Sequence, residues 1–243
     1  MSKTKIEKKD WWYVAIISAL VVVITILSVS LGIKNKIIHE DKSYYDKKCE
    51  AFAVQNMNLS KGQIVFVGDS ITDLFPLDDY FSGLDKAVYN RGISGDTTAG
   101  VLKRLEGSVL DLEPSKIVIM IGTNDINGGV SSAKLLKNYE EIITKIKEKL
   151  PNTEIYCISI IPQNEDLETY TTLNVEQSTE RILSVNNDLE HELADKFGIT
   201  YLDLFSLVAD ENNRLIKTYS NDGIHLNGAG FAVWANLIKP YLD

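Results

Sequence analysis

The sequence predicts an α/β fold: a three-layer α/β/α sandwich around a five-stranded parallel sheet in flavodoxin-like order, with an N-terminal transmembrane helix in addition. Two observations support this prediction. From Gly62 onward, short β-rich apolar runs alternate with longer segments of helical periodicity, as in strands joined by helical crossovers. Near the N-terminus, an uncharged apolar stretch is long enough to cross a bilayer as a helix.

The alternating region supplies five expected strands and four expected helices. Strand–helix alternation implies parallel strands with right-handed crossovers, which places helices on both faces of the sheet. The longest amphipathic helix has apolar residues at helical spacing and ends at Pro151. The strands are expected at 64–67, 87–89, 117–121, 154–161 and 199–204, and the helices at 97–110, 132–150, 175–197 and 228–237.

The first 60 residues divide by composition into three segments. Residues 1–10 are basic, residues 11–33 contain the apolar stretch, and residues 34–60 are charged and polar, which we interpret as a stalk or linker before a globular domain at 61–243. Trp and Tyr residues at one end of the apolar stretch resemble an interfacial aromatic belt and favour an uncleaved transmembrane anchor. A cleaved signal peptide stays an alternative, because Ser28-Val29-Ser30 resembles a cleavage site of small residues.

Lysines flank both ends of the apolar stretch, so their distribution does not decide the orientation of the anchor. Long domains are translocated largely regardless of their charge, and a basic segment followed by an apolar one is typical of export signals. The prediction is therefore a single-pass protein of the cell membrane with an extracellular globular domain.

The globular region is strongly acidic. The whole chain has a net charge of −9 and residues 1–36 carry +4, which leaves −13 for the rest. Such a charge argues against nucleic acid or anionic lipid headgroups as the main partner. Cys49 and Cys157 provide no disulfide framework, and with His39 and His191 they form no ligand cluster for zinc. We expect no metal and no cofactor, and the oligomeric state stays open.

A candidate nucleophile follows the first expected strand. Ser70, in Gly68-Asp69-Ser70-Ile71-Thr72, comes directly after a buried apolar run and before a short expected helix. Its hydroxyl is therefore expected at the carboxyl end of a strand, where open α/β sheets keep their ligand crevice. A helix N-terminus at this point would present N–H groups to a developing oxyanion. The alternative is that Ser70 serves only as a helix N-cap.

A serine hydroxyl needs a base within hydrogen-bond reach, and that base needs a partner that fixes its tautomer. Asp222 and His225 lie three residues apart in a Gly-containing turn that can point both side chains the same way. The chain has three histidines, and the other two are poorly placed, so His225 is the candidate base by elimination. The alternative is a surface turn with an incidental histidine.

Two further blocks could supply oxyanion donors. Asn124, in Gly122-Thr123-Asn124-Asp125, follows an expected strand and offers a side-chain amide. Gly95, in Ser94-Gly95-Asp96-Thr97, offers a backbone N–H that a substrate can approach closely, because glycine has no Cβ. The alternative interpretation is that the two blocks serve only as a loop and a turn. The acidic residues within and beside the motifs are expected to be caps or loop braces: Asp69, Asp73, Asp96 and Asp125.

The four blocks, in this order, resemble the SGNH hydrolases, the GDSL-type esterases and acylhydrolases. The resemblance spans about residues 62–240 and implies that Ser70 is the nucleophile and that Asp222 and His225 complete a catalytic triad. It also implies an oxyanion hole formed by the Ser70 backbone N–H, Gly95 and Asn124. On this basis the domain at 61–243 is expected to be an SGNH hydrolase domain.

The expected activity is that of a membrane-anchored serine esterase that hydrolyses carboxylic esters, such as short O-acetyl groups on glycans, through an acyl-enzyme. Lysophospholipid or thioester hydrolysis, acetyl transfer to a cell-wall glycan and a non-enzymatic binding module stay alternatives. The polar loop 162–174 follows the fourth expected strand on the side of the site. Tyr170 in this loop is a candidate for substrate binding, and a solvated connection is the other interpretation.

Overall fold

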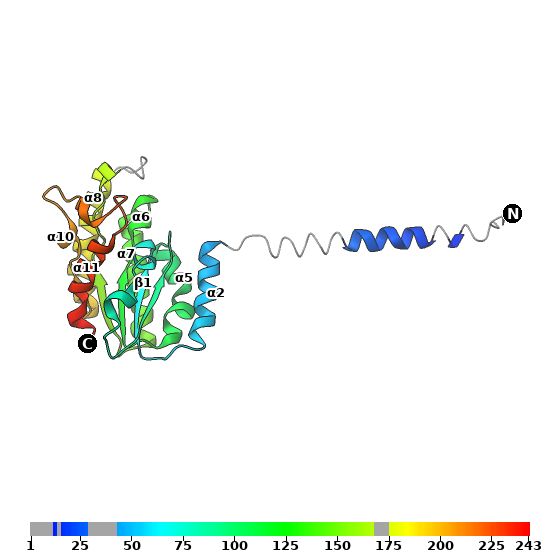
Figure 1. Ribbon diagram of the computed structural model, residues 1–243, viewed down its shortest axis with the longest axis horizontal. Helices are drawn as coiled ribbons and strands as arrows, with labels where there is room; N and C mark the ends of the chain where they lie inside the picture. Colours follow the sequence, from blue (N-terminus) through cyan, green and yellow to red (C-terminus); the bar gives the residue numbers. More distant parts are fainter. Residues whose placement is uncertain (1–11, 14–15, 29–42, 168–174) are drawn as a thin grey trace. The chain divides into compact units, whose positions relative to one another are not determined.

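The structure is a computed structural model that describes residues 12–13, 16–28, 43–167 and 175–243. The chain divides into two compact units, Met1–Tyr44 and Tyr45–Asp243. In the second unit, helices cover both faces of a sheet of five parallel strands in the order β2-β1-β3-β4-β5 (Figure 1). The predicted α/β/α sandwich, its parallel sheet and its flavodoxin-like strand order are therefore confirmed. The strands are β1 (Ile64–Gly68), β2 (Val88–Gly92), β3 (Lys116–Met120), β4 (Glu154–Ile158) and β5 (Thr200–Leu202).

The central strands are buried on both faces, as expected for a parallel sheet covered by helices. Alternate residues enter two separate hydrophobic clusters: Val65 and Val67 face one helical layer, whereas Ile64 and Phe66 face the other. Strand β4 ends three residues before the expected 161. The backbone N–H and C=O of Ile160 bond to the Asn186 side chain, both at 2.9 Å, instead of a neighbouring strand.

The first helical layer contains the long amphipathic helices. Leu105 of α5, Tyr139 of α7 and Ile182 of α8 lie in one buried cluster with the strand residues that face them. The bounds agree with the expected helices to within about two residues, except that the last expected helix of this layer continues as a π-helical turn, Leu189–Ala194, and a short helix. The helices of this layer are α5 (Thr98–Ser108), α7 (Ser132–Lys149), α8 (Val175–Asp188) and α9 (Asp195–Phe197).

The second layer is built from shorter helices and an aromatic cluster. Phe75 stacks on Phe231 with ring centroids 4.8 Å apart and lies 4.7 Å from the Trp234 ring. Phe66 of β1 approaches the same rings from the sheet. Such aromatic pairs contribute about 0.5–1.5 kcal/mol each beyond the area they bury. The helices of this layer are α3 (Ser70–Asp73), α4 (Leu77–Phe81), α10 (Phe205–Val208) and α11 (Gly228–Ile238).

Part of the segment predicted as a stalk belongs to the second compact unit. Helix α2 (Tyr44–Asn56) buries Phe52, whose ring centroid lies 4.7 Å from the guanidinium of Arg91. Tyr45 donates its hydroxyl to the Gly100 carbonyl at 2.8 Å. The compact unit therefore begins at Tyr45 and includes this helix. Because Phe52 is the one buried residue of α2, the packing of this helix leaves little periodic signal in the sequence.

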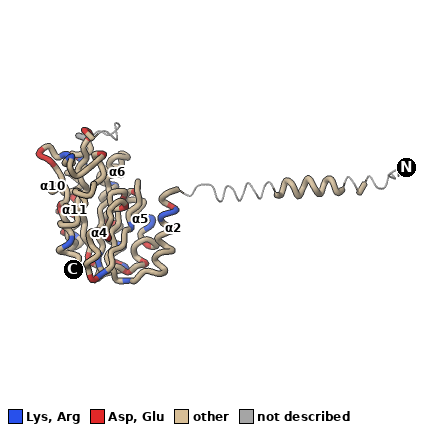
Figure 2. The backbone as a smooth tube through the Cα atoms, in the orientation of Figure 1, with Lys and Arg blue, Asp and Glu red and all other residues tan. Residues whose placement is uncertain are grey.

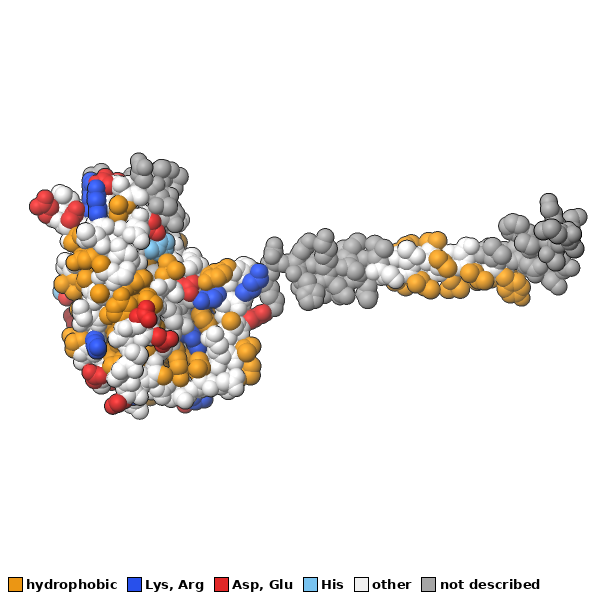
Figure 3. All heavy atoms as spheres, viewed as in Figure 1, with side chains coloured by type: hydrophobic (Ala, Val, Ile, Leu, Met, Phe, Trp, Pro, Cys, Tyr) orange, Lys and Arg blue, Asp and Glu red, His pale blue; other side chains and the backbone are white. Residues whose placement is uncertain are grey.

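Charges are interspersed over the second unit. Figure 2 shows both basic and acidic residues at separate places along its backbone, and pairs such as Lys196–Glu140, at 2.6 Å, join opposite charges. Apolar side chains that remain exposed are scattered over the face drawn in Figure 3. Exposed pairs of this kind contribute little to stability, typically about 0–1 kcal/mol each. The fold therefore depends mainly on the two buried clusters on either side of the sheet.

The predicted transmembrane helix is wrong. Among the residues that the structure describes, no helix is both long and apolar enough to span a bilayer. The prediction placed this helix at residues 11–33, of which the structure describes 12–13 and 16–28.

Candidate active site

Ser70 occupies the position that the sequence predicts, at the carboxyl end of β1 and the start of α3. The N-cap of this helix is Asp69, whose carboxylate accepts the Ile71 N–H at 3.0 Å. Ser70 is therefore the first helical residue and not the cap. The N–H of a first helical residue has no acceptor within its helix, so it can be donated to a bound group. Ser70 is partly exposed and lines a pocket, as access by a substrate requires.

His225 and Asp222 reach Ser70 from the opposite end of the chain. His225 Nε2 lies 2.8 Å from Ser70 Oγ, and His225 Nδ1 lies 2.7 Å from Asp222 Oδ2. A carboxylate on one ring nitrogen fixes the imidazole tautomer that accepts a proton at the other. The three side chains thus form a continuous hydrogen-bonded chain of nucleophile, base and orienting carboxylate.

The turn that holds Asp222 also sets its charge. Burial works to raise the pKa of Asp222, but the backbone N–H of His225, the His225 ring and the backbone N–H of Ile224 outweigh it, so the pKa lies below the ordinary value. The two backbone donors bind Oδ1 at 2.8 and 2.9 Å. Gly223 adopts φ +83°, and a Cβ there would lie 2.0 Å from the Asn164 carbonyl oxygen. Glycine is therefore required for the turn that presents the carboxylate and the imidazole together.

Gly95 and Asn124 lie beside Ser70, as predicted for oxyanion donors. Gly95 has φ +81°, and no atom lies within 4 Å of the place where a Cβ would be, so its backbone is open to a ligand. Asn124 begins the short helix α6 (Thr123–Asn127) together with Thr123. One hydrogen of its amide is donated to the Asp96 carbonyl at 2.8 Å, which leaves the second hydrogen for a substrate.

One pocket brings these groups together. Ser70, Gly95, Asn124 and His225 all line a cavity of about 450 Å³. The sequence analysis did not identify the other lining residues. Asn127 lies one helical turn after Asn124, so its spacing was a usable signal, whereas the apolar members carry no distinguishing pattern. These other residues are Leu74, Ser94, Thr123, Asn127 and Ile224.

Aromatic packing connects the elements that carry the nucleophile and the base. Phe75 follows α3, and Phe231 and Trp234 belong to α11, which begins three residues after His225. Tyr80 of α4 also donates its hydroxyl to the Gly228 carbonyl at the start of α11 at 2.9 Å. Packing of α3 and α4 against α11 therefore stabilises the 2.8 Å approach between Ser70 and His225.

The acidic residues of the motifs act as caps and loop braces, as expected. Burial raises the pKa of the Asp69 carboxyl to about 7. Asp73 accepts the backbone N–H and the hydroxyl of Ser94 at 3.0 and 2.9 Å. Asp125 accepts the backbone N–H and the hydroxyl of Thr98 at 2.8 and 2.6 Å. These bonds attach the loops that carry Gly95 and Asn124 to neighbouring elements.

Asp96 has a partner that the sequence analysis did not foresee. Its Oδ2 accepts Arg104 Nε at 2.7 Å, and the two side chains are only 1% and 2% exposed. Burial raises the pKa of Asp96 above its ordinary value, although the Arg104 charge opposes this. Helix α5 is capped by Thr97 and not by Asp96, because the Thr97 side chain accepts the Gly100 N–H. Tyr170, the candidate substrate-binding residue, lies outside the described residues.

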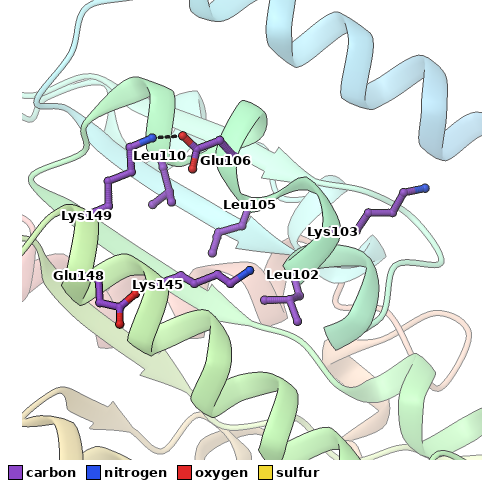
Figure 4. A pocket seen from close by; sticks show the side chains of 8 residues that line it. All are labelled: Leu102, Lys103, Leu105, Glu106, Leu110, Lys145, Glu148 and Lys149. Carbon is purple, nitrogen blue, oxygen red and sulfur yellow. Dashed lines mark hydrogen bonds and ion pairs between the residues drawn. The ribbon is translucent and has the colours of Figure 1, made fainter.

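A hollow of similar volume, about 450 Å³, lies between α5 and α7 and differs in chemistry. Figure 4 shows leucine, lysine and glutamate side chains around it, with an ion pair between Lys149 and Glu106 at one end. None of these eight described side chains is a Ser, Cys or His. The hollow has no candidate nucleophile or imidazole base, so it does not compete with the Ser70 pocket as an esterase site.

Comparison with known proteins gives the same family as the motifs. The sequence pattern of the GDSL-like lipase/acylhydrolase family matches residues 66–233, well over half of the chain. The human platelet-activating factor acetylhydrolase IB subunit alpha2 is 27% identical over 180 residues, which cover 73% of each chain. The same subunit from Gallus gallus is 26% identical over the same length.

Solved structures show the same fold. A protein from Streptococcus pneumoniae, described provisionally as a platelet activating factor, is 32% identical, with a TM-score of 0.76 over 89% of this chain and 99% of that chain. A GDSL-like lipase from Bacteroides thetaiotaomicron is 24% identical, with a TM-score of 0.72 over 82% and 98%. The chain therefore belongs to the GDSL-like lipase/acylhydrolase family of SGNH hydrolases and is a carboxylic ester hydrolase.

Proposed function

We propose that this enzyme hydrolyses short-chain acyl esters, acetyl esters above all, through a covalent intermediate on Ser70. The observation that carries the proposal is the hydrogen-bonded chain from Ser70 Oγ through the His225 ring to Asp222, at 2.8 and 2.7 Å, inside a pocket that also holds Gly95 and Asn124. A nucleophile, a base and oxyanion donors are the groups that acyl transfer requires.

The proposed reaction has two steps. Ser70 Oγ attacks the ester carbonyl carbon while His225 Nε2 takes its proton, and the oxyanion is bound by the Ser70 N–H, the Gly95 N–H and the Asn124 amide. The imidazolium then gives the proton to the departing alcohol, which leaves an acyl-Ser70 ester. Water, deprotonated by the same imidazole, attacks this ester, and the acid is released as Ser70 recovers its proton.

Two observations support a short acyl group. Ile224 and Leu74 contribute apolar walls close to Ser70 in a pocket of about 450 Å³, which is near the lower end of the usual size of ligand sites. The names of the human and bovine relatives also describe an acetylhydrolase. The strongly acidic globular region favours an uncharged alcohol, such as an O-acetylated glycan, over an anionic one.

An acetylated phospholipid is the second candidate, because the relatives are named for platelet-activating factor. A panel of aryl esters from acetyl to palmitoyl, followed by acetylated oligosaccharide and 2-acetyl phospholipid, tests the substrate proposal. We expect kcat/KM to fall steeply beyond about four acyl carbons and to favour the oligosaccharide. Equal activity on palmitoyl esters would contradict the short-acyl proposal. A preference for the phospholipid would make it, and not the glycan, the favoured substrate.

An extracellular catalytic domain is also a proposal. It is supported by the order of the N-terminal sequence, in which a basic segment precedes an apolar one, as in export signals. Protease treatment of intact cells tests it: we expect loss of the domain from intact cells, and protection until lysis would contradict this location.

A further inference from the structure

Arg104 lies at the centre of the segments that carry the predicted oxyanion donors. It projects from α5, and its side chain is 2% exposed. Nε donates to Asp96 Oδ2 at 2.7 Å, and Nη2 donates to the Gly68 carbonyl at 3.1 Å. One planar guanidinium therefore joins the end of β1 to the loop that follows β2.

Each of these bonds lies next to a donor. Gly68 precedes Ser70 by two residues at the end of β1, and its carbonyl also accepts the Ile93 N–H at 3.1 Å. Asp96 directly follows Gly95, and its own carbonyl accepts the Asn124 amide at 2.8 Å. The Arg104–Asp96 pair is thus in direct contact with, or one bond away from, all three segments that would bind the oxyanion.

We propose that Arg104 and Asp96 are positioning residues that hold the Ser70, Gly95 and Asn124 donors at the spacing the oxyanion requires. This inference rests on the proposed function, because it assigns a role within the same site. Neither of these two side chains is among the residues that line the Ser70 pocket. It acts through the Gly68 carbonyl and the Asp96 backbone, and its contribution is therefore expected in kcat and not in substrate binding.

The chemistry of the pair fits positioning better than stability. Replacing a buried ion pair with well-packed apolar residues is often neutral or stabilising, so burial of these charges is weak evidence for a stabilising role. An arginine presents Nε and Nη2 in one rigid plane, which fixes the direction of both acceptors. The Asp96 carboxylate also lies against the backbone of Gly100, where a Cβ would be only 1.8 Å from Asp96 Oδ1. The carboxylate is therefore confined on two sides.

The test is Arg104→Lys, which keeps the charge but loses the planar fork. We expect kcat on an acetyl ester to fall by roughly 10- to 100-fold, since small misplacements of catalytic groups have effects of this order, while KM stays within about twofold. Lys116→Met is the matched control. Lys116 is also a buried cation bonded to carbonyls, of Tyr241 and Asp243, but it begins β3 at the other end of the sheet. We expect it to lower stability and leave kcat unchanged.

A double-mutant cycle with Asn124→Ala separates positioning from general damage. If Arg104 acts through the oxyanion donors, the fold-losses in kcat of Arg104→Lys and Asn124→Ala combine to less than their product. An unchanged kcat in Arg104→Lys, fold-losses that multiply fully, or an equal kcat loss in Lys116→Met would each overturn the inference. If Arg104→Lys does not fold, Asp96→Asn takes its place in the same cycle.

Ser70→Ala distinguishes failure of this inference from failure of the proposed function. If Ser70→Ala keeps full activity, the proposed reaction itself is wrong, and Arg104 has no oxyanion to position. If Ser70→Ala is inactive while Arg104→Lys is as active as the parent enzyme, the reaction stands and the positioning role is refuted.

Discussion

Asn124→Ala is the most informative single substitution, because the two hydrogens of the amide have separate roles in this account. The first, to the Asp96 carbonyl at 2.8 Å, contributes to stability, and its loss should cost about 1 kcal/mol. The second hydrogen is free to bind a developing oxyanion beside Ser70. Removing one such donor typically lowers kcat by about 10²- to 10³-fold, which corresponds to roughly 2.7–4 kcal/mol of barrier. We therefore expect a large loss of kcat with a small loss of stability.

Initial rates on an acetyl ester, with urea unfolding of the same preparation, measure both quantities. Asn127→Ala is the matched control, because Asn127 is another asparagine of α6 in the same pocket, and its Oδ1 accepts the Gln163 amide at 3.0 Å. Its kcat should stay within about fivefold of the parent value, as expected for a side chain that gives no oxyanion bond. Equal losses of kcat in both variants would refute the oxyanion role of Asn124.

Three further outcomes are expected. Because burial raises the pKa of Asp69 to about 7, its contribution to stability is complete below about pH 4 and is lost as the pH rises to about 7. Asp69→Asn keeps a capping oxygen but cannot ionise, so this part of the stability loss between pH 5 and pH 8 should be absent from its urea unfolding. An unaltered pH dependence of the unfolding free energy would contradict the assignment to Asp69. Gly223→Ala should reduce activity at least tenfold by displacing the catalytic turn from the Asn164 carbonyl, and a fully active variant would argue that the turn tolerates a Cβ. Phe52→Ala should lower the unfolding free energy by roughly 3 kcal/mol, and an unchanged urea midpoint would mean that α2 does not pack on the domain.

The sheet was predictable because parallel strands buried on both faces leave continuous apolar runs. Residues 64–67 and 117–121 are such runs, and both lie within or beside observed strands. Strand ends were less accurate, since side chains such as that of Asn186 satisfy the backbone where the ladder stops. The transmembrane prediction depended on apolar composition alone, and the residues that the structure describes include no helix long and apolar enough to span a bilayer.

The site was predictable where chemistry is concentrated in short motifs. Ser70 is recognised from its position at a strand end, and Asp222 and His225 from their spacing in a Gly-containing turn. The structure brings the three side chains into hydrogen-bond contact. Arg104 was not, because an arginine in an amphipathic helix has the appearance of a solvated residue until its burial is known. Its contacts with Gly68 and Asp96 join residues 36 and 8 positions away, which no local pattern records.

The central claim is that the Ser70 hydroxyl, activated by His225, is the nucleophile. Intact-mass and peptide analysis after treatment with a fluorophosphonate ester tests it most directly, with His225→Ala as a folded comparison. We expect one phosphonyl adduct on the peptide that contains Ser70, at a rate greatly reduced in His225→Ala. An unmodified Ser70 peptide in active enzyme, or an adduct formed equally fast without the imidazole, would contradict the account.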